Sequence, residues 1–286
     1  MKKNKVSATY LLPAGVIYTV LLIIPIIYAF ALSFVKWDGI GTMKFIGFDN
    51  YIRLFKDSRI SNAAVNTIIL ATVNVVLVNV LALLLALMLN KTSKRTSVFR
   101  VIYFLPYVLS GVAISLIWKG ILSYTGVLNS VFNALGLEKL VGYYFSSRWP
   151  AMAFISVVEI WHSLGYYMII YLAALQTVPE ELYEACTIDG GTSFQKFRYI
   201  TLPMIIPGAT VSLLMSIISQ LRIYDTVKVM TDGGPGYDTE TIVYSIVSYG
   251  FGKSQMGYAS AIAVVLFFAI GIMTILTKRL GRQMEG

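Results

Sequence analysis

Long apolar segments alternate with shorter polar ones along almost the whole chain. Most apolar segments run for about 20 residues or more, the length that an α-helix needs to cross ~30 Å of hydrocarbon. The pattern predicts an all-α polytopic membrane protein with a single transmembrane domain over residues 1–286. Six transmembrane helices are predicted, at about residues 10–35, 64–89, 101–122, 151–176, 204–227 and 258–277.

The first apolar segment has a second interpretation, as part of a secretory signal. Ala29-Phe30-Ala31 has the small residues of a signal-peptidase site. The apolar run is longer than the hydrophobic region of a typical signal, which favours a retained transmembrane helix. Among the polar connections, residues 231–236 have glycine and proline turn chemistry, and residues 241–251 predict a short helix beside the membrane or re-entering it.

Composition excludes a soluble globular protein. Hydrophobic residues make up 57% of the chain, charged residues only 13%, and the mean hydropathy is +0.73. A net charge of +9 is compatible with nucleic-acid binding, but many of the basic residues lie in clusters beside apolar segments, as the positive-inside rule describes. We therefore expect both termini in the cytoplasm and no nucleic-acid partner. The clusters contain Lys2, Lys3, Lys5, Lys91, Lys94, Arg95, Arg100, Lys278, Arg279 and Arg282, whereas Lys36, Lys44, Arg53, Lys56 and Arg59 lie on the predicted outer side.

A polar stretch over residues 179–203 interrupts the apolar pattern and predicts two short helices. Pro179 suits a first helical position, and Gly190-Gly191 can end the first helix in the left-handed region. Thr192 and Gln195 have the spacing of a capping box at the start of the second helix. A helical hairpin of this size exposes small and aromatic side chains for docking into a partner, namely Ala185, Cys186, Phe194 and Phe197.

This stretch resembles the EAA signature of the membrane subunits of ABC importers, Glu-Ala-Ala-x3-Gly-x9-Ile-x-Leu-Pro. Six positions match in register, and Cys186 replaces the second alanine of the signature. The resemblance implies that residues 179–203 form the coupling loop that docks on a cytoplasmic ATPase; the alternative is an ordinary helical hairpin at a membrane surface. The implied ATPase-coupling residues are Glu184, Ala185, Cys186, Asp189, Gly190, Ile200, Leu202 and Pro203.

Further matches resemble the carbohydrate-importing, MalF-like branch of these permeases. They are Leu175-Gln176 before Pro179, Ile188 to Gly191, and the segment from Thr231 to Glu240. The resemblance implies a bacterial or archaeal cytoplasmic membrane, a second MalG-like permease, two ATPase subunits, and an extracellular or periplasmic sugar-binding protein. The sequence contains no Gly-x4-Gly-Lys-Ser/Thr, so we expect ATP and Mg²⁺ on the partner ATPase, and no cofactor, metal or catalytic residue in this chain.

Polar residues at membrane depth are candidates for the substrate pathway, because charged and polar groups there are costly. The helix at 151–176 carries Glu159, His162, Ser163 and Tyr166 on one face, and the helix at 204–227 carries Ser216, Ser219 and Gln220. Hydroxyl, amide and carboxylate groups beside aromatic rings suit a sugar. Hydrogen bonding between helices is the alternative, including a structural pair of Glu159 with Arg222 or with His162.

Three other functions compete with sugar import. A permease of this kind can carry glycerol-3-phosphate or another polar solute. An ion-coupled secondary transporter would be expected to have more buried acids and an internal repeat of helices. An intramembrane enzyme using Glu159 and His162 as acid and base would leave the EAA resemblance unexplained.

Overall fold

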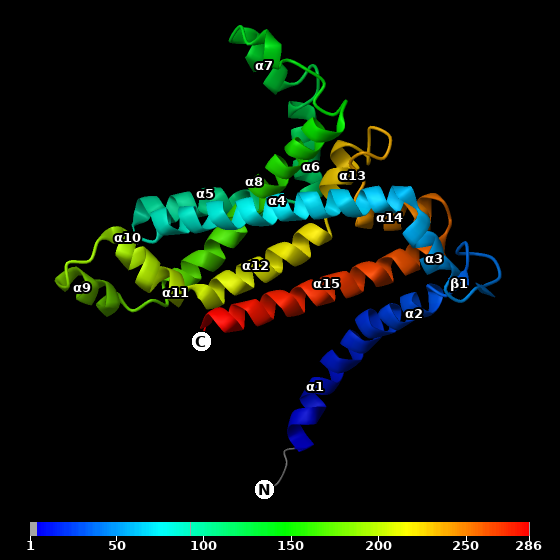
Figure 1. Ribbon diagram of the computed structural model, residues 1–286, viewed down its shortest axis with the longest axis horizontal. Coiled ribbons are helices and arrows are strands. Elements are labelled where there is room, and N and C mark those ends of the chain that lie inside the picture. The colour runs from blue at the N-terminus through cyan, green and yellow to red at the C-terminus, as the bar shows by residue number, and fades with distance from the viewer. Residues whose placement is uncertain (1–4, 92, 286) are drawn as a thin grey trace. The chain divides into compact units, whose positions relative to one another are not determined.

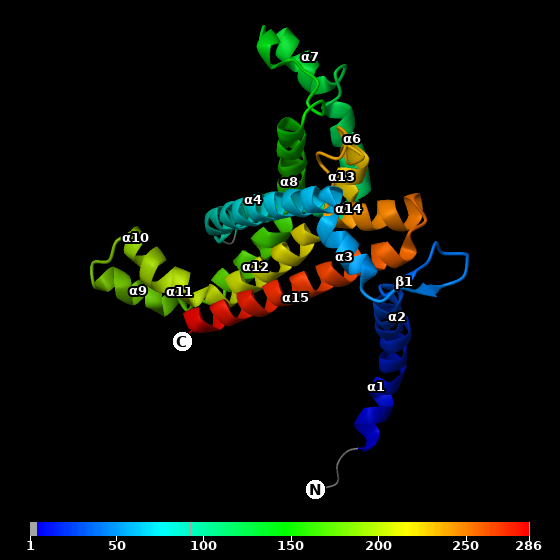
Figure 2. The ribbon, with the colours of Figure 1, turned by 45° about the vertical axis from the view of Figure 1, so that its right-hand side comes forward.

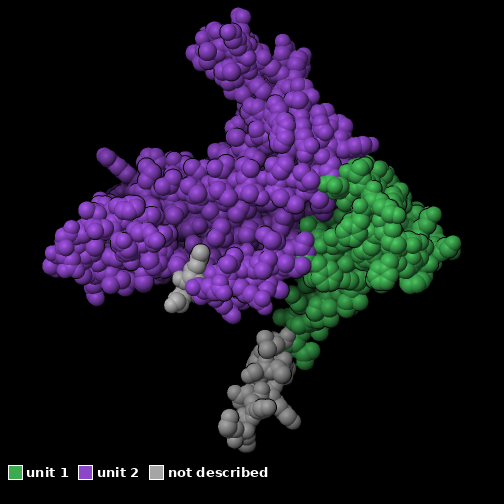
Figure 3. Space-filling view, in the orientation of Figure 1, with its two compact units in different colours: residues 1–61, 245–268 green, residues 62–244, 269–286 purple. Residues whose placement is uncertain are grey.

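The computed structural model describes residues 5–91 and 93–285, so Lys2, Lys3 and Thr92 lie outside the described residues. The described chain is mostly helical, with one short β-hairpin, which confirms the predicted all-α fold. Its contacts divide it into two compact units, Met1–Ser61 with Ser245–Phe268 and Asn62–Tyr244 with Ala269–Gly286, which Figure 3 shows in separate colours. We call them unit 1 and unit 2 and describe each by itself.

Five helices in the described chain are long and apolar enough to cross a membrane. They cover Leu12–Leu32, Ser58–Leu89, Arg148–Leu175, Ile206–Met230 and Met256–Gln283. Two further helices, α5 (Lys94–Val108) and α6 (Gly111–Ile121), meet at 95° and pass the same test only when taken together. Counted as one span, this pair makes the total six. A shorter apolar helix covers Ile242–Gly252, where the sequence predicts one.

The bend between α5 and α6 differs from the straight helix predicted for residues 101–122. Leu109 and Ser110 adopt extended backbone conformations, so the helical hydrogen bonds stop at Val108 and start again at Gly111. Sharp bends in helices occur mostly at proline and at glycine–serine pairs. Pro106 lies within the last turn of α5, and Ser110-Gly111 supplies the pair. We call Leu109–Ser110 the helix break.

Unit 1 contains α1 (Lys5–Tyr18), the π-helical turn η1 (Thr19–Ile23), α2 (Ile24–Leu32), a β-hairpin and α3 (Asp49–Lys56). Strand β1 (Val35–Lys36) pairs antiparallel with β2 (Lys44–Phe45), with Val35 opposite Phe45. The hydroxyls of Tyr249 and Tyr258 donate to Asp57 at 2.8 and 2.9 Å. Partial burial raises the pKa of the Asp57 carboxyl, but these hydrogen bonds outweigh it and hold that pKa below its usual value.

The second segment of unit 1, Ser245–Phe268, contains the π-helical turn η4 (Ser248–Gly252) and the first half of α15 (Met256–Glu285). Gly257 lies so close to β1 that a Cβ there would contact the Val35 carbonyl oxygen. The start of α15 is therefore fixed against the β-hairpin.

Unit 2 is organised around α8 (Arg148–Leu175), which packs against α5, α6, α12 (Ile206–Leu221) and α13 (Asp225–Met230). Small residues allow the close contacts. A Cβ on Gly165 would meet the Tyr103 carbonyl oxygen of α5, and one on Gly208 would meet the Ala174 side chain. Small residues at such contacts are typical of helix packing in membranes.

The two ends of unit 2 carry different elements (Figures 1 and 2). One end holds α9 (Glu180–Ile188), α10 (Ser193–Lys196) and α11 (Leu202–Met204), together with the connection from α4 (Ser58–Leu89) to α5. The C-terminal part of α15 reaches this end, because Gly281 lies against Thr210 near the start of α12. The basic clusters at 91–100 and 278–282 thus lie near the polar stretch. The opposite end carries α7 (Val127–Ala134), the 3-10 turn η2 (Glu138–Leu140) and α13. The residues of α14 (Ile242–Val247) are divided between unit 2 and unit 1.

Candidate functional site

The stretch 179–203 forms a helical hairpin, which we call the polar hairpin. Helix α9 ends in a Schellman motif: the N–H of Gly190 donates to the Thr187 carbonyl at 3.1 Å and that of Gly191 to the Cys186 carbonyl at 2.8 Å. Gly190 has a φ of +76°, as the sequence predicts. Pro179 differs from the prediction, because it lies one residue before the helix with an extended ψ of 132°. Its carbonyl accepts from Leu182, so its role is that of an N-cap.

The second half of the polar hairpin begins with the predicted capping box. The Thr192 hydroxyl accepts from the N–H of Gln195, and the Gln195 side chain accepts from the N–H of Thr192 at 2.7 Å. The two halves are tied together by side chains, since Lys196 Nζ donates to Thr187 Oγ1 at 2.6 Å. The π-helical turn η3 (Phe197–Thr201) then leads into α11. The polar hairpin is held by its own hydrogen bonds.

The outer surface of the polar hairpin is unusually apolar for a solvent-facing loop. Ile188, Phe194 and Tyr199 are 86%, 72% and 73% exposed. Exposed apolar groups gathered in one place mark interaction sites. Glu184 is exposed beside them, and no hydrogen bond or ion pair to its side chain occurs within the described chain. Of the remaining predicted coupling residues, Ala185, Asp189, Gly190 and Pro203 are exposed, and Cys186, Ile200 and Leu202 are partly buried.

Three of the polar residues predicted on α8 gather around the helix break. His162 Nε2 lies 3.2 Å from the Leu109 carbonyl oxygen, which has lost its helical partner. Tyr166 stacks on Tyr107 of α5 with ring centroids 4.5 Å apart. The Glu159 carboxylate accepts a hydrogen bond from Thr226 of α13. We call Tyr107, Glu159, His162, Tyr166 and Thr226 the break cluster.

The proposed ion pair between Glu159 and Arg222 does not form. Arg222 lies where α12 ends, and no described residue forms an ion pair with Glu159. His162 and Gln220 are near enough to interact with the carboxylate, as is Asp225, which faces the break from the start of α13. The Glu159 carboxylate therefore has polar groups nearby from α12 and α13 as well as from its own helix.

Two of the other four candidate residues, Ser216 and Gln220, connect helices inside unit 2. Gln220 Oε1 accepts from Asn74 of α4 at 2.8 Å, and Ser216 Oγ accepts from Asn79 at 2.9 Å. Ser163 donates to the Glu159 backbone carbonyl of its own helix. Ser219 is exposed on α12. Ser216 and Gln220 thus have the hydrogen bonds between helices that the alternative describes, whereas Ser163 bonds within α8.

Sequence reasoning missed two parts of the break cluster. Thr226 lies past the predicted polar stripe and reaches Glu159 only because α13 packs beside α6 and α8. Tyr107 comes from the segment before the break. The sequence signal for the break was Pro106 followed by Ser110-Gly111, a combination that interrupts helices.

The sequence matches the family of binding-protein-dependent transport system inner membrane components over residues 78–286. The chain belongs to this family. Related proteins over nearly their whole length include the multiple sugar-binding transport system permease protein MsmF of Streptococcus mutans, 32% identical over 97% of this chain and 95% of that protein. The lactose transport system permease protein LacF of Rhizobium radiobacter is 33% identical over 96% and 93%.

A solved structure has the same fold. The crystal structure of a bacterial ABC transporter that imports the acidic polysaccharide alginate matches with a TM-score of 0.85, 25% identity and coverage of 97% of this chain and 95% of that one. These matches confirm the resemblance to importer permeases. The chain is a multi-pass membrane protein and a transport subunit rather than an enzyme, and ATP hydrolysis belongs to a separate chain.

Proposed function

We propose that this chain forms half of the translocation pathway of an ATP-driven sugar importer, with residues 1–286 as one transmembrane domain. The polar hairpin carries the proposal. It is held by its own hydrogen bonds and exposes apolar side chains on its outer surface. It also holds the EAA residues at one end of unit 2, in a chain that belongs to a family of transport subunits. The second permease is a MalG-like homologue, and two cytoplasmic ATPase subunits supply the energy.

The solute passes the break cluster. Glu159, His162 and Tyr166 offer a carboxylate, an imidazole and a phenol ring around a bent helix, and this mixture suits hydroxyl groups. Sugar as the solute is supported by the relatives, whose names include transport of multiple sugars, lactose and trehalose or maltose. A binding protein outside the membrane delivers it, as in the alginate transporter crystallised with its periplasmic protein.

Both termini lie in the cytoplasm of a bacterial or archaeal cell. The proposal is supported by the basic clusters 91–100 and 278–282, which lie at the end of unit 2 that carries the polar hairpin. A reporter fused after Met284 should be active only in its cytoplasmic form, and one inserted between Gly233 and Tyr237 only outside. Exchanged signals would overturn this topology.

Co-purification and uptake test the function itself. A tagged chain should bring down an ATPase and a second permease. The assembled complex in vesicles should take up labelled lactose, maltose or trehalose only with ATP inside and binding protein outside. Uptake of glycerol-3-phosphate in place of these sugars would change the assigned solute but leave the assigned transport function unchanged. A chain that purifies alone and drives uptake with an ion gradient would reject the proposal as a whole.

A further inference from the structure

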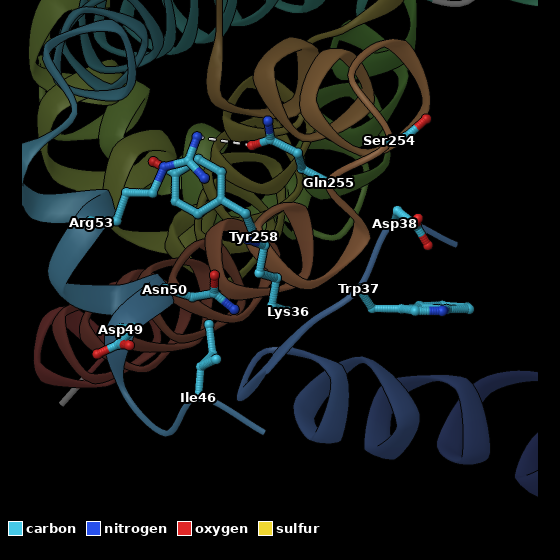
Figure 4. A pocket seen from close by; sticks show the side chains of 10 residues that line it. All are labelled: Lys36, Trp37, Asp38, Ile46, Asp49, Asn50, Arg53, Ser254, Gln255 and Tyr258. Atoms are coloured by element: carbon cyan, nitrogen blue, oxygen red, sulfur yellow. Dashed lines mark hydrogen bonds between the residues drawn. The ribbon is translucent and has the colours of Figure 1, made fainter. Parts of the chain in front are cut away.

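A pocket in unit 1 has no part in the function proposed above. It has a volume of about 480 Å³ and lies between the β-hairpin, α3 and the start of α15 (Figure 4). Small-molecule sites in proteins commonly have volumes of ~300–1,000 Å³. We call it the strand pocket. The apolar spans Ser58–Leu89 and Met256–Gln283 begin within a few residues of Arg53 and Gln255 in its lining, so the strand pocket lies at a membrane surface rather than at membrane depth.

One wall of the strand pocket is the indole of Trp37, which Figure 4 shows edge-on at the margin. The ring is held in place, because its Nε1 donates to the Gly41 carbonyl at 3.0 Å. Its backbone is also fixed, since the Trp37 carbonyl accepts from the N–H of Gly257 at 3.3 Å. A fixed indole offers a broad apolar face at small entropic cost.

The opposite wall carries hydrogen-bonding groups that are held in position. The Arg53 guanidinium lies over the Tyr258 ring, 4.0 Å from its centroid, and donates to Gln255 Oε1 at 2.8 Å. No described carboxylate forms an ion pair with it, so the guanidinium keeps donors for a ligand. The Asn50 amide nitrogen donates to the carbonyls of Ser33 and Val35, which leaves its oxygen as an acceptor.

The charges around the strand pocket balance. Two cations, Lys36 and Arg53, line it with two carboxylates, Asp38 and Asp49. A free phosphate or carboxylate would meet as many negative groups as positive ones. The lining therefore favours a neutral ligand with many hydroxyl groups over an anion.

We propose that the strand pocket binds one pyranose ring of a neutral saccharide, stacked on Trp37 and hydrogen-bonded to Arg53, Asn50 and Gln255. A sugar ring has an apolar C–H face and a rim of hydroxyls, and these match the two walls. This inference rests on the proposed function, which makes saccharide the cargo and places the strand pocket on the outer side. The site holds saccharide outside the membrane.

The test uses the full chain in lipid nanodiscs prepared without glycoside detergent, because such a detergent would itself compete for the site. Saturation-transfer difference NMR is recorded with maltose, lactose and trehalose as probes. At least one should give a signal with the unchanged chain. Trp37→Ala should lower that signal about fivefold or more, through loss of the stacking face. Trp37→Phe, which keeps a ring, should retain more of it than Trp37→Ala.

Two further variants guard against misfolding and non-specific effects. Arg53→Gln, on the opposite wall, should also weaken the signal. Trp149→Ala removes a tryptophan that is 64% exposed and belongs to unit 2, and it should leave the signal unchanged. Gel filtration and circular dichroism of every variant report folding.

The contrary outcomes are distinct. Absence of signal with all three disaccharides, or an equal loss in Trp149→Ala, overturns the saccharide site. So does a Trp37→Ala chain that keeps the signal but no longer binds the sugar-binding protein, because the strand pocket would then be a protein contact. The co-purification described above reads out the proposed function separately, since it needs no saccharide. A missing ATPase rejects that function whatever the NMR shows.

Discussion

The polar hairpin and the break cluster both lie where the run of long apolar helices is interrupted, but different kinds of contact hold them together. The polar hairpin is held by contacts between residues close in sequence, such as Thr192 with Gln195 and Lys196 with Thr187. The break cluster joins α5, α8 and α13, and its bond from Thr226 to Glu159 spans 67 positions. A local structure can be replaced as a unit, whereas the break cluster depends on three helices being correctly packed. Substitutions should therefore separate coupling from the pathway.

The largest effect is expected from Gly190→Leu. The backbone at Gly190 has a φ of +76°, and a Cβ there would meet no heavy atom within 4 Å. The cost is therefore conformational, about 1 kcal/mol or more. The Schellman turn should be distorted and sugar uptake abolished, with normal insertion in the membrane. ATPase activity and uptake in reconstituted vesicles measure this.

A matched control exists for that substitution. Gly136 has a similar φ of +70°, is equally free of neighbours, and directly follows α7, which lies at the opposite end of unit 2. Gly136→Leu should carry the same backbone cost and keep uptake. Normal, coupled transport by Gly190→Leu would mean that the polar hairpin is not the coupling element.

Glu159→Gln should have the next largest effect. Glutamine keeps the shape and can still accept from Thr226, but it removes the charge. If Glu159 lines the path, uptake should fall about tenfold while the complex still assembles. A tenfold decrease is the effect expected from losing one hydrogen bond to a charged group. Labelled-sugar uptake and gel filtration of the complex are the measurements, with Glu138→Gln, outside the break cluster, as control. Loss of assembly would make Glu159 a structural residue.

His162→Phe should have a smaller effect. Phenylalanine keeps the ring beside Tyr107 but removes the nitrogen 3.2 Å from the Leu109 carbonyl oxygen. The helix break loses one hydrogen bond, worth about 1 kcal/mol, so uptake should fall a few-fold. Pulsed electron resonance between labels on α5 and α6 should show a broader distance distribution. An unchanged distribution would show that His162 does not hold the bend.

Cys186→Ala should be nearly silent, within about twofold in uptake, because the thiol lies partly buried against Gly191 and a smaller side chain creates no clash. Gly191→Ala is the informative companion. Its Cβ would lie 2.8 Å from the Cys186 carbonyl oxygen as well as against the thiol. Uptake by Gly191→Ala should therefore fall, and adding Cys186→Ala should not restore it. If Cys186→Ala did restore uptake to the Gly191→Ala chain, the added methyl group would clash with the Cys186 thiol alone.

The same contrast explains what could be predicted from the sequence. The glycine turn and the capping box follow from local rules, so Gly190, Thr192 and Gln195 were placed correctly. The number of apolar helices follows from length and hydropathy. The Pro179 position was wrong by one residue, because proline is accepted both at and just before a helix start.

The contacts of the break cluster could not be predicted in this way. Pairing Glu159 with Arg222 was reasonable by charge, but α12 ends at Leu221, just before Arg222, and the chain turns before α13. Thr226, four residues later, faces α8 instead. Which residue meets Glu159 depends on the direction of α13, and no local pattern encodes that direction.

Asn79 has a consequence for how unit 2 can move. Its amide donates to Val75 and Ser216, and its oxygen accepts from Tyr171 and Ser212. An asparagine side chain has two N–H donors and an oxygen with two lone pairs, so it has no capacity left for water. Sliding any of α4, α8 or α12 by one residue would strip this buried amide of partners. The three helices therefore form one rigid body, and any conformational change during transport must move α4, α8 and α12 together.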